Sequence, residues 1–169
     1  MAKTLKDDLK KRHGFASLRQ EAYLNLARTQ AELSAGLAAL LKAHGLSEAT
    51  YNILRILRGV DRFPVAGRTA LPCGEVAERM VTRVPDVTRL MDRLEKAELI
   101  ERVRCEDDRR VVRAQISPAG RALLRKLTPK VDRAEQAMFP ALTDRELATL
   151  SRLLEKSRAT ASAKTSESP

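Results

Sequence analysis

Residues 73–117 contain the order of elements that most constrains the fold. The pattern predicts a short helix over 73–80, a turn centred on 81–83, a second helix over 84–99 and a charged hairpin over 100–117. In both helices apolar residues recur every three or four positions, so each helix has one apolar face. A helix-turn-helix places its second helix in a DNA groove, and a flanking hairpin can add a contact to the backbone or minor groove. DNA binding is therefore the leading hypothesis.

The predicted second helix carries polar side chains opposite its apolar face. Thr82 is expected to cap this helix, and Pro85 falls in its first turn, where a missing N–H costs nothing. Arg89 could pair with a guanine edge, and Thr88 could reach a thymine methyl group or a phosphate. The residues expected at the DNA are Thr82, Arg83, Pro85, Asp86, Thr88, Arg89 and Arg93.

The hairpin offers a second candidate contact. Its apolar residues alternate roughly and are expected to share one face: Ile100, Val103, Val112, Ala114 and Ile116. An acidic residue beside an arginine at the tip can hold the guanidinium extended, which suits a narrow minor groove. The alternative is that Asp108 and Arg110 merely pair on a solvated turn. The residues expected to contact DNA here are Arg104, Asp108, Arg109 and Arg110.

Long helical patterns flank this segment on both sides. Residues 17–43 form the first, which Gly45 ends, and Ser47 can cap the next helix, whose apolar stripe is Tyr51, Leu54 and Leu57. After the hairpin, Ser117-Pro118 opens a helix that Pro129 should kink and Pro140 should stop. Thr143 and Glu146 have capping-box spacing before a last helix. Such long terminal helices suggest a dimer that reads two half-sites; alternatively, they pack only within one chain.

The stretch VPDVTRLMDRLEKAELIERV, followed by DDRRVVRAQISPAGRALL, resembles the MarR (multiple antibiotic resistance regulator) family of winged helix-turn-helix transcription factors. The likeness includes TRLMDRLE, the hairpin signature Asp108-x-Arg110 and the junction 116–120, and it covers about residues 15–156. Upstream, HGLSEATYNILRIL is similar to the second helix of that family. The sequence departs from the family in two places. Residues 59–70 form a longer connector than usual, and Glu98 stands where the family often has Gly.

The resemblance implies a mainly α fold with a small β wing, in which dimerisation helices flank a winged helix-turn-helix. In this chain the expected parts are a basic N-terminal extension (1–16), an N-terminal dimerisation helix (17–46), the DNA-binding head (47–117), C-terminal dimerisation helices (118–156) and a disordered tail (157–169). The first and last helices of two chains are expected to interlock in a triangular, two-lobed homodimer.

The charge distribution gives only general support. A net charge of +10 indicates a polyanionic partner. However, residues 83–113 hold nine Lys/Arg against eight Asp/Glu, whereas most of the excess lies in residues 1–20 and 118–133. The basic ends could follow phosphates without sequence preference, or they could be solvated tails.

Several other classes of site find little support. No apolar run approaches membrane-spanning length, and the N-terminus lacks a signal-peptide core, so a cytoplasmic protein is expected. Neither Cys73 nor Cys105 clusters with a histidine, and no metal or cofactor is expected. Both are interpreted as free thiols in a reducing compartment. The alternative is that Cys105 senses oxidants, because Arg104 and Arg109 would lower its thiol pKa.

The sequence thus predicts a non-enzymatic transcriptional regulator that binds a pseudo-palindromic operator as a homodimer, more often as a repressor than as an activator. The resemblance implies release by a small effector, often a phenolic or aromatic acid, bound between the dimerisation helices and the reading head. The candidate effector contacts are Arg102, Thr88, Tyr51 and Arg28. For Arg102 a salt bridge or a phosphate contact is the alternative. Rival hypotheses are a nonspecific architectural DNA-binding protein, a redox-responsive regulator acting through Cys105, and a protein-interaction module.

Overall fold

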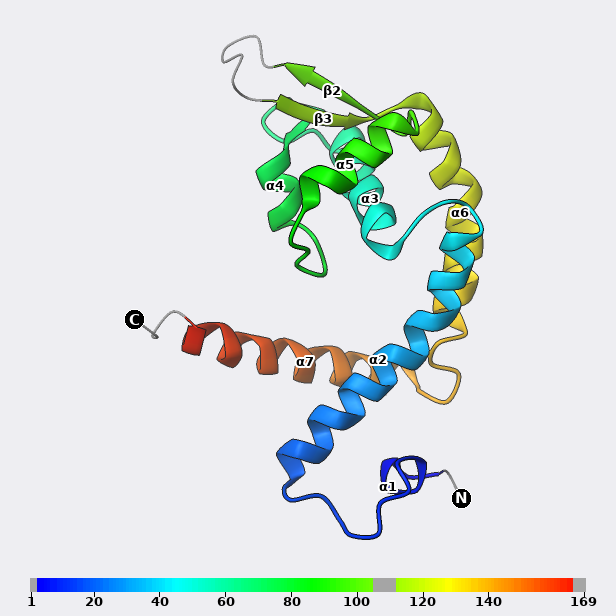
Figure 1. Ribbon diagram of the computed structural model, residues 1–169, viewed down its shortest axis with the longest axis vertical. Coiled ribbons are helices and arrows are strands. Elements are labelled where there is room, and N and C mark those ends of the chain that lie inside the picture. Colours follow the sequence, from blue (N-terminus) through cyan, green and yellow to red (C-terminus); the bar gives the residue numbers. More distant parts are fainter. Residues whose placement is uncertain (1–2, 105–111, 166–169) are drawn as a thin grey trace. The chain divides into compact units, whose positions relative to one another are not determined.

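The computed structural model (Figure 1) describes residues 3–104 and 112–165. Most of these residues are helical, and a small antiparallel sheet accompanies the helices, which confirms the expected fold class. The chain divides into two compact units, 1–134 and 135–169. The elements are α1 (Leu5–Asp8), α2 (Leu18–Lys42), α3 (Glu48–Arg62), β1 (Leu71–Pro72), α4 (Cys73–Glu78), α5 (Val87–Lys96), β2 (Ile100–Arg104), β3 (Val112–Ile116), α6 (Pro118–Gln136) and α7 (Asp144–Thr165).

Helix α3 is the central element of the first unit. Its apolar stripe is buried, and Ile53, Leu54 and Leu57 have no exposed surface. Helix α3 contacts β3 as well as α2, α4 and α5. Burying three such side chains contributes several kcal/mol, since each is worth about 1.5–3 kcal/mol.

The start of α3 forms as the sequence predicts. Gly45 adopts a φ of +74°, in the left-handed region that favours glycine, and the chain leaves α2 there. Ser47 then caps α3, because the Thr50 N–H donates to its hydroxyl at 3.2 Å. The Ser47 N–H donates in return to the Thr50 hydroxyl at 2.8 Å, which completes a capping box.

The sheet has the order β1-β3-β2, and both pairings are antiparallel. Ile100 lies opposite Ile116, and both are buried. Val103 was expected on the same face, but this prediction is wrong. Successive strand residues point to opposite faces, so Val103 lies on the other face and is 41% exposed. Strand β1 was not predicted, because it is only two residues long and one of them is Pro72.

The junction between the sheet and α6 depends on a close backbone approach. Ser117 is buried; its hydroxyl donates to the Glu98 carbonyl at 2.6 Å and accepts the Gly120 N–H at 3.0 Å. A Cβ at Gly120 would overlap the Leu99 carbonyl oxygen and would lie 2.9 Å from Cγ1 of Ile116. The Ser-Pro-Ala-Gly sequence at this junction therefore needs glycine at its last position.

Two polar contacts then attach α6 to α3. Arg121 donates to the Asp61 carboxylate at 3.0 Å, and Arg58 donates to the Thr128 hydroxyl at 3.1 Å. The apolar side of α6 is buried beside these contacts at Leu124, Leu127 and Val131. Pro129 lies inside the helix, which ends at Gln136, ahead of Pro140.

Helix α2 differs from α3 in how little it buries. Leu41 near its C-terminal end is buried, but Leu18 is 84%, Tyr23 69% and Leu26 50% exposed. Much of the apolar surface of α2 is thus open on a single chain. In the basic N-terminal segment, the short helix α1 is capped by Thr4, which forms a capping box with Asp7.

The second unit contains α7. Thr143 donates through its N–H and its hydroxyl to the Glu146 carboxylate, at 2.8 and 2.7 Å, as the capping-box spacing predicts. These two bonds lower the pKa of Glu146 from its ordinary value. The helix continues to Thr165. The predicted disordered tail, 157–169, is therefore wrong for residues 157–165. The segment is small and polar, but its alanines are the strongest helix formers.

None of the helices within the described ranges is both long and apolar enough to span a membrane.

We expect Gly120→Ala to lower the free energy of unfolding by about 1–3 kcal/mol, because the added methyl group collides with backbone that cannot move freely. Gly59→Ala is the matched control. A Cβ at Gly59, in α3, would meet no side chain and no other element, so this change should stabilise the protein by up to about 1 kcal/mol. Urea denaturation of both variants measures the difference. Equal stability of the two would contradict the close approach at Gly120.

Candidate nucleic-acid interface

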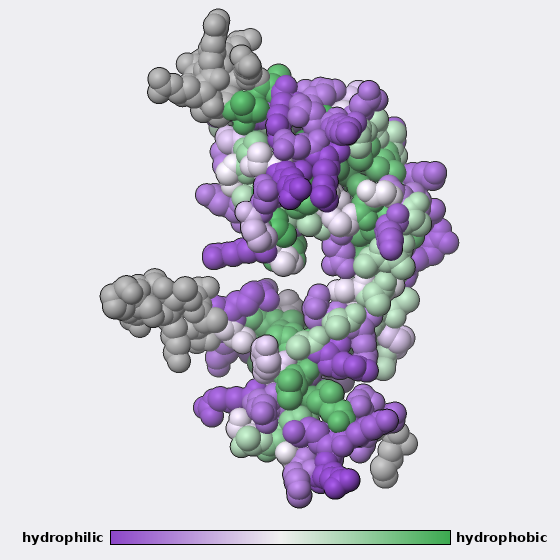
Figure 2. All heavy atoms as spheres, viewed as in Figure 1, coloured by the Kyte–Doolittle hydropathy of each residue, from purple (hydrophilic) through white to green (hydrophobic). Residues whose placement is uncertain are grey.

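Helices α4 and α5 form the predicted helix-turn-helix. The inner side of the motif packs against α3, and Val76, Met91 and Leu94 are buried there. The outer side of α5 is polar and exposed, and Figure 2 shows hydrophilic side chains gathered over it. The exposed α5 residues are Thr88, Arg89, Asp92, Arg93 and Lys96. The inward and outward faces of α5 are thus those that its apolar spacing predicts.

The predicted start of the second helix is wrong. Helix α5 begins at Val87, and Asp86 caps it by accepting the Arg89 N–H at 2.9 Å. Thr82 is not the cap, and Pro85 lies ahead of the helix. The physical reason is local: the residue before a proline avoids helical geometry, which excludes Val84, and Asp is a strong N-cap. Thr82, Arg83, Pro85 and Asp86 are all exposed.

The turn between α4 and α5 is attached to α3. The Val81 N–H donates to the side-chain oxygen of Asn52 at 2.9 Å, across 29 positions of sequence. Sequence reasoning missed Asn52. The available signal was a polar residue between Tyr51 and Ile53 in a helix that otherwise supplies core side chains.

The wing is the hairpin of β2 and β3. The structure describes its two strands, and residues 105–111 between them lie outside the described residues. Strands β2 and β3 pair from Ile100↔Ile116 to Arg104↔Val112. Cys105, Asp108, Arg109 and Arg110 lie outside the described residues, as does the side chain of Arg104. Their proposed roles in DNA contact and oxidant sensing therefore remain predictions. The other cysteine, Cys73, is a half-buried free thiol.

Arg102 connects the wing to α5. One of its guanidinium nitrogens contacts the Asp92 carboxylate at 2.5 Å and the Thr88 carbonyl at 3.5 Å. Its Nε lies 3.5 Å from the Glu95 carboxylate, an ion pair without hydrogen-bond geometry, so this buried Nε has no hydrogen-bond partner among the described residues. The structure thus shows the salt bridge that was the alternative interpretation of Arg102. The charge of Arg102 is neutralised by carboxylates of α5.

The other candidate effector contacts have partners of their own. Tyr51 is buried, and its hydroxyl accepts a hydrogen bond from Arg55 at 3.1 Å. Arg28 is exposed and pairs with Glu32 on the same helix at 2.5 Å. Glu98, at the C-terminal end of α5, has a φ of +58°, which explains why glycine suits this position in the resembled family.

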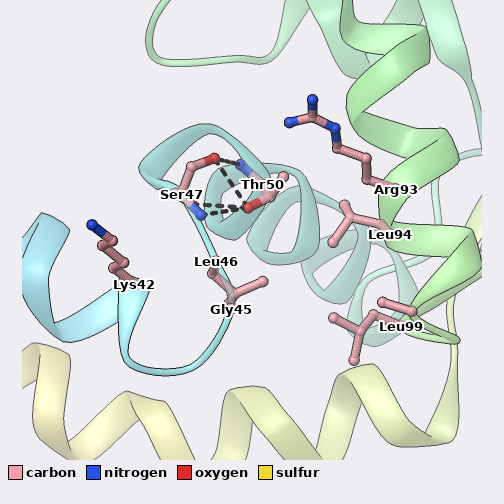
Figure 3. Close-up of a pocket in the computed structure, with 9 residues that line it drawn as sticks. Lys42, Gly45, Leu46, Ser47, Thr50, Arg93, Leu94 and Leu99 are labelled. Carbon is pink, nitrogen blue, oxygen red and sulfur yellow. Dashed lines mark hydrogen bonds between the residues drawn. The ribbon is translucent and has the colours of Figure 1, made fainter.

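A cavity of about 340 Å³ lies between the end of α2, the start of α3 and the C-terminal half of α5. Figure 3 shows Lys42 and Arg93 on either side of the Ser47–Thr50 capping box, with leucines below. The lining residues are Lys42, Gly45, Leu46, Ser47, Thr50, Arg93, Leu94, Ala97 and Leu99. Two cations and no acidic residue line it, above an apolar floor. This combination suits a small acid with an apolar ring.

None of Arg102, Thr88, Tyr51 and Arg28 lines this cavity. Sequence reasoning assigned Arg93 only to DNA and missed Lys42. The two are 51 positions apart, so only the fold brings them to one cavity. Among the residues that the structure describes, no group of His, Cys, Asp or Glu is suited to hold a metal ion.

Comparison with known proteins identifies similar chains. A model of the MarR family matches residues 46–112. The HTH-type transcriptional regulator YsmB of Bacillus subtilis (strain 168) is 36% identical over 83 residues, which are 49% of this chain and 57% of that protein. The regulator YpoP of the same organism is 34% identical over 111 residues, which are 66% of this chain and 73% of that protein.

Solved structures agree with these matches. A MarR transcription factor from Planctomyces limnophilus is 37% identical, with a TM-score of 0.62 over 84% of this chain and 98% of that one. Two structures share the fold at lower identity, both with a TM-score of 0.73. Sco3205 from Streptomyces coelicolor, solved in complex with DNA, is 21% identical over 88% of this chain and 91% of its own. BpsR from Bordetella bronchiseptica, whose DNA binding is regulated by 6-hydroxynicotinic acid, is 22% identical over 86% and 98%.

We expect Arg102→Met to lower the free energy of unfolding by about 1 kcal/mol, because Asp92 and Glu95 lose their shared cation. Methionine keeps the apolar stem of the side chain. Arg79→Met is the matched control, since Arg79 pairs with Glu75 within one exposed helical stretch; its loss should cost less than about 0.5 kcal/mol. Chemical denaturation at low salt compares the two variants. If Arg102→Met were as stable as Arg79→Met, the contact between β2 and α5 would add nothing to stability.

Proposed function

The chain belongs to the MarR family of winged helix-turn-helix transcription factors, and we propose that it represses neighbouring genes by binding a pseudo-palindromic operator. It acts as a homodimer in the cytoplasm and is not an enzyme. The observation that carries this proposal is the exposed polar face of α5, whose opposite face is fixed to the core through Met91 and Leu94. A helix presented in this way can enter a major groove without disturbing the fold. The DNA complex of Sco3205, which shares this fold, supports the assignment.

The N-terminal half of α5 is the part proposed to read bases. Arg89 is exposed there, and its five N–H donors suit the two acceptors on a guanine edge. Thr88 is exposed beside it and can reach a phosphate or a thymine methyl group. Asp86 has a different role. Its carboxylate accepts a hydrogen bond from the backbone N–H of Arg89 and so fixes the start of the helix.

The exposed apolar side chains of α2 support a homodimer. Leu18, Tyr23 and Leu26 together leave a large apolar surface open to water on one chain. Surfaces of this kind mark interaction sites. A second copy supplies the same surface under two-fold symmetry, and it also supplies the second reading head that a palindromic operator needs.

The cavity beside α5 is the proposed effector site. Lys42 from α2 can bind the carboxylate of a small acid, while Leu46, Leu94 and Leu99 contact an aromatic ring and Arg93 from α5 lines the opposite side. A ligand held between residues of α2 and α5 favours one position of α5 relative to α2. It therefore lowers operator affinity to the extent that it binds the released state better. BpsR, a protein of the same fold, responds to an aromatic acid.

A test of operator binding begins with selection of a preferred sequence from random DNA by the full-length protein. We expect affinity for that sequence to exceed affinity for random DNA by at least about 10³ at physiological salt. We expect Arg89→Ala to reduce operator affinity at least about 30-fold, since the homodimer loses one bidentate base contact in each half-site and each is worth about 1–3 kcal/mol.

Arg125→Ala is the control for this test, because it removes an equal charge from an exposed position on α6. It should reduce the affinity for operator and random DNA by the same small factor. Undiminished operator binding by Arg89→Ala would refute the base contact. Equal affinity of the wild type for all sequences would favour an architectural protein.

The effector site is tested by titrating benzoate and hydroxybenzoates into the protein–operator complex. We expect at least one acid to release the wild type, and Lys42→Met to need an approximately 10-fold higher concentration for the same release. Lys126→Met, at an exposed position on α6, is the matched control and should respond as the wild type does. Release by neutral benzamide as efficiently as by benzoate would rule out recognition of the carboxylate.

A further inference from the structure

Val81 is exposed to an unusual degree for an apolar residue in a fixed position. At 89% it has the highest exposure of the large apolar side chains within the described residues, slightly above Leu18 at 84%. Its neighbour Met80 is 9% exposed, so the chain passes from the core to the surface in one step. Thr82 and Arg83, which follow, are exposed polar residues.

Exposure alone has little meaning, because single apolar residues are common on protein surfaces. Val81 differs in that its backbone is held from two directions. The Met80 side chain is buried on one side, and the Val81 N–H donates to Asn52 of the buried helix α3 at 2.9 Å. This hydrogen bond fixes where the exposed isopropyl group lies. A valine also has few rotamers, so little entropy is lost when it is brought into contact with a partner.

The location of Val81 indicates the partner. The turn from Val81 to Asp86 leads directly into α5, and in a helix-turn-helix this N-terminal end of the second helix contacts base edges. In the major groove the apolar group on a base edge is the C5 methyl of thymine. The valine side chain cannot donate or accept a hydrogen bond, so it is suited to contact this methyl group and unsuited to contact a phosphate.

We propose that Val81 contacts the methyl group of one thymine in each half-site of the operator, and that Asn52 is the positioning residue that holds Val81 there. The inference rests on the proposed function and adds a residue that determines specificity outside the recognition helix. It also gives Asn52 a role in DNA sequence preference, although Asn52 itself lies on α3, beneath the turn.

The test uses the selected operator with each thymine replaced, one at a time, by deoxyuridine, which lacks only the C5 methyl group. Burying one such carbon is worth about a fourfold change in affinity. We expect the full-length wild type to lose about fourfold at one thymine position of each half-site. Val81→Ala should bind the unmodified operator about 16-fold more weakly, because it removes the fourfold contact in both half-sites, and should be indifferent to deoxyuridine at that position. Val65→Ala, which removes the same atoms from another exposed valine, should keep the wild-type profile.

Asn52 is tested by the same affinity ratio, thymine over deoxyuridine. Asn52→Ala should bring the ratio close to one. Asn52→Asp retains an acceptor oxygen for the Val81 N–H and should restore the ratio, even though its added charge weakens binding to all DNA. A role of Asn52 in stability alone would lower the amount of folded protein in both variants without changing the ratio.

Two results would overturn the proposal while leaving the proposed function intact. One is a sequence-specific wild type whose affinity is unchanged by deoxyuridine at every position. The other is a Val81→Ala variant that keeps the wild-type deoxyuridine profile. A wild type that selects no sequence at all would instead refute the proposed function together with this inference.

Discussion

The burial of α3 is the constraint on which the DNA-binding head depends. Its apolar stripe fills the space under the sheet, and α4 and α5 pack against it. Its polar side chains attach the surrounding parts: Asn52 holds the turn, and Arg58 and Asp61 hold α6. Because one rigid helix makes all these contacts, the outer face of α5 and the turn before it are presented in a fixed relation to each other. Such preorganisation reduces the entropy lost on binding.

The sequence predicts those parts of the fold that depend on local chemistry. The caps at Ser47 and Thr143 follow from the spacing of their hydrogen-bonding partners, and Gly45 follows from the left-handed geometry at a helix end. The buried stripe of α3 and the two faces of α5 follow from helical periodicity. These features need only a few neighbouring residues, which is why an unaligned sequence is sufficient to predict them.

Other features arise only when distant segments meet. Arg102 pairs with α5, Asn52 holds a turn 29 positions away, and Lys42 shares a cavity with Arg93. No spacing rule predicts such contacts. The start of α5 was misplaced for a different reason. The choice between a helix that begins at Val84 and one that begins at Val87 depends on Pro85 and Asp86. The length of α7 was underestimated because a small, polar composition was interpreted as disorder although it is rich in alanine.

Arg102 of the wing forms an ion pair with α5, and Arg93, near the C-terminal end of α5, lines the cavity. Operator recognition therefore depends on the outer face of α5 lying in a major groove. Dimethyl sulfate protection of guanine N7 atoms on the selected operator measures this directly. We expect protected guanines confined to two half-sites whose centres lie about 10–10.5 base pairs apart. Protection that is absent or evenly spread, while the protein remains bound, would contradict it.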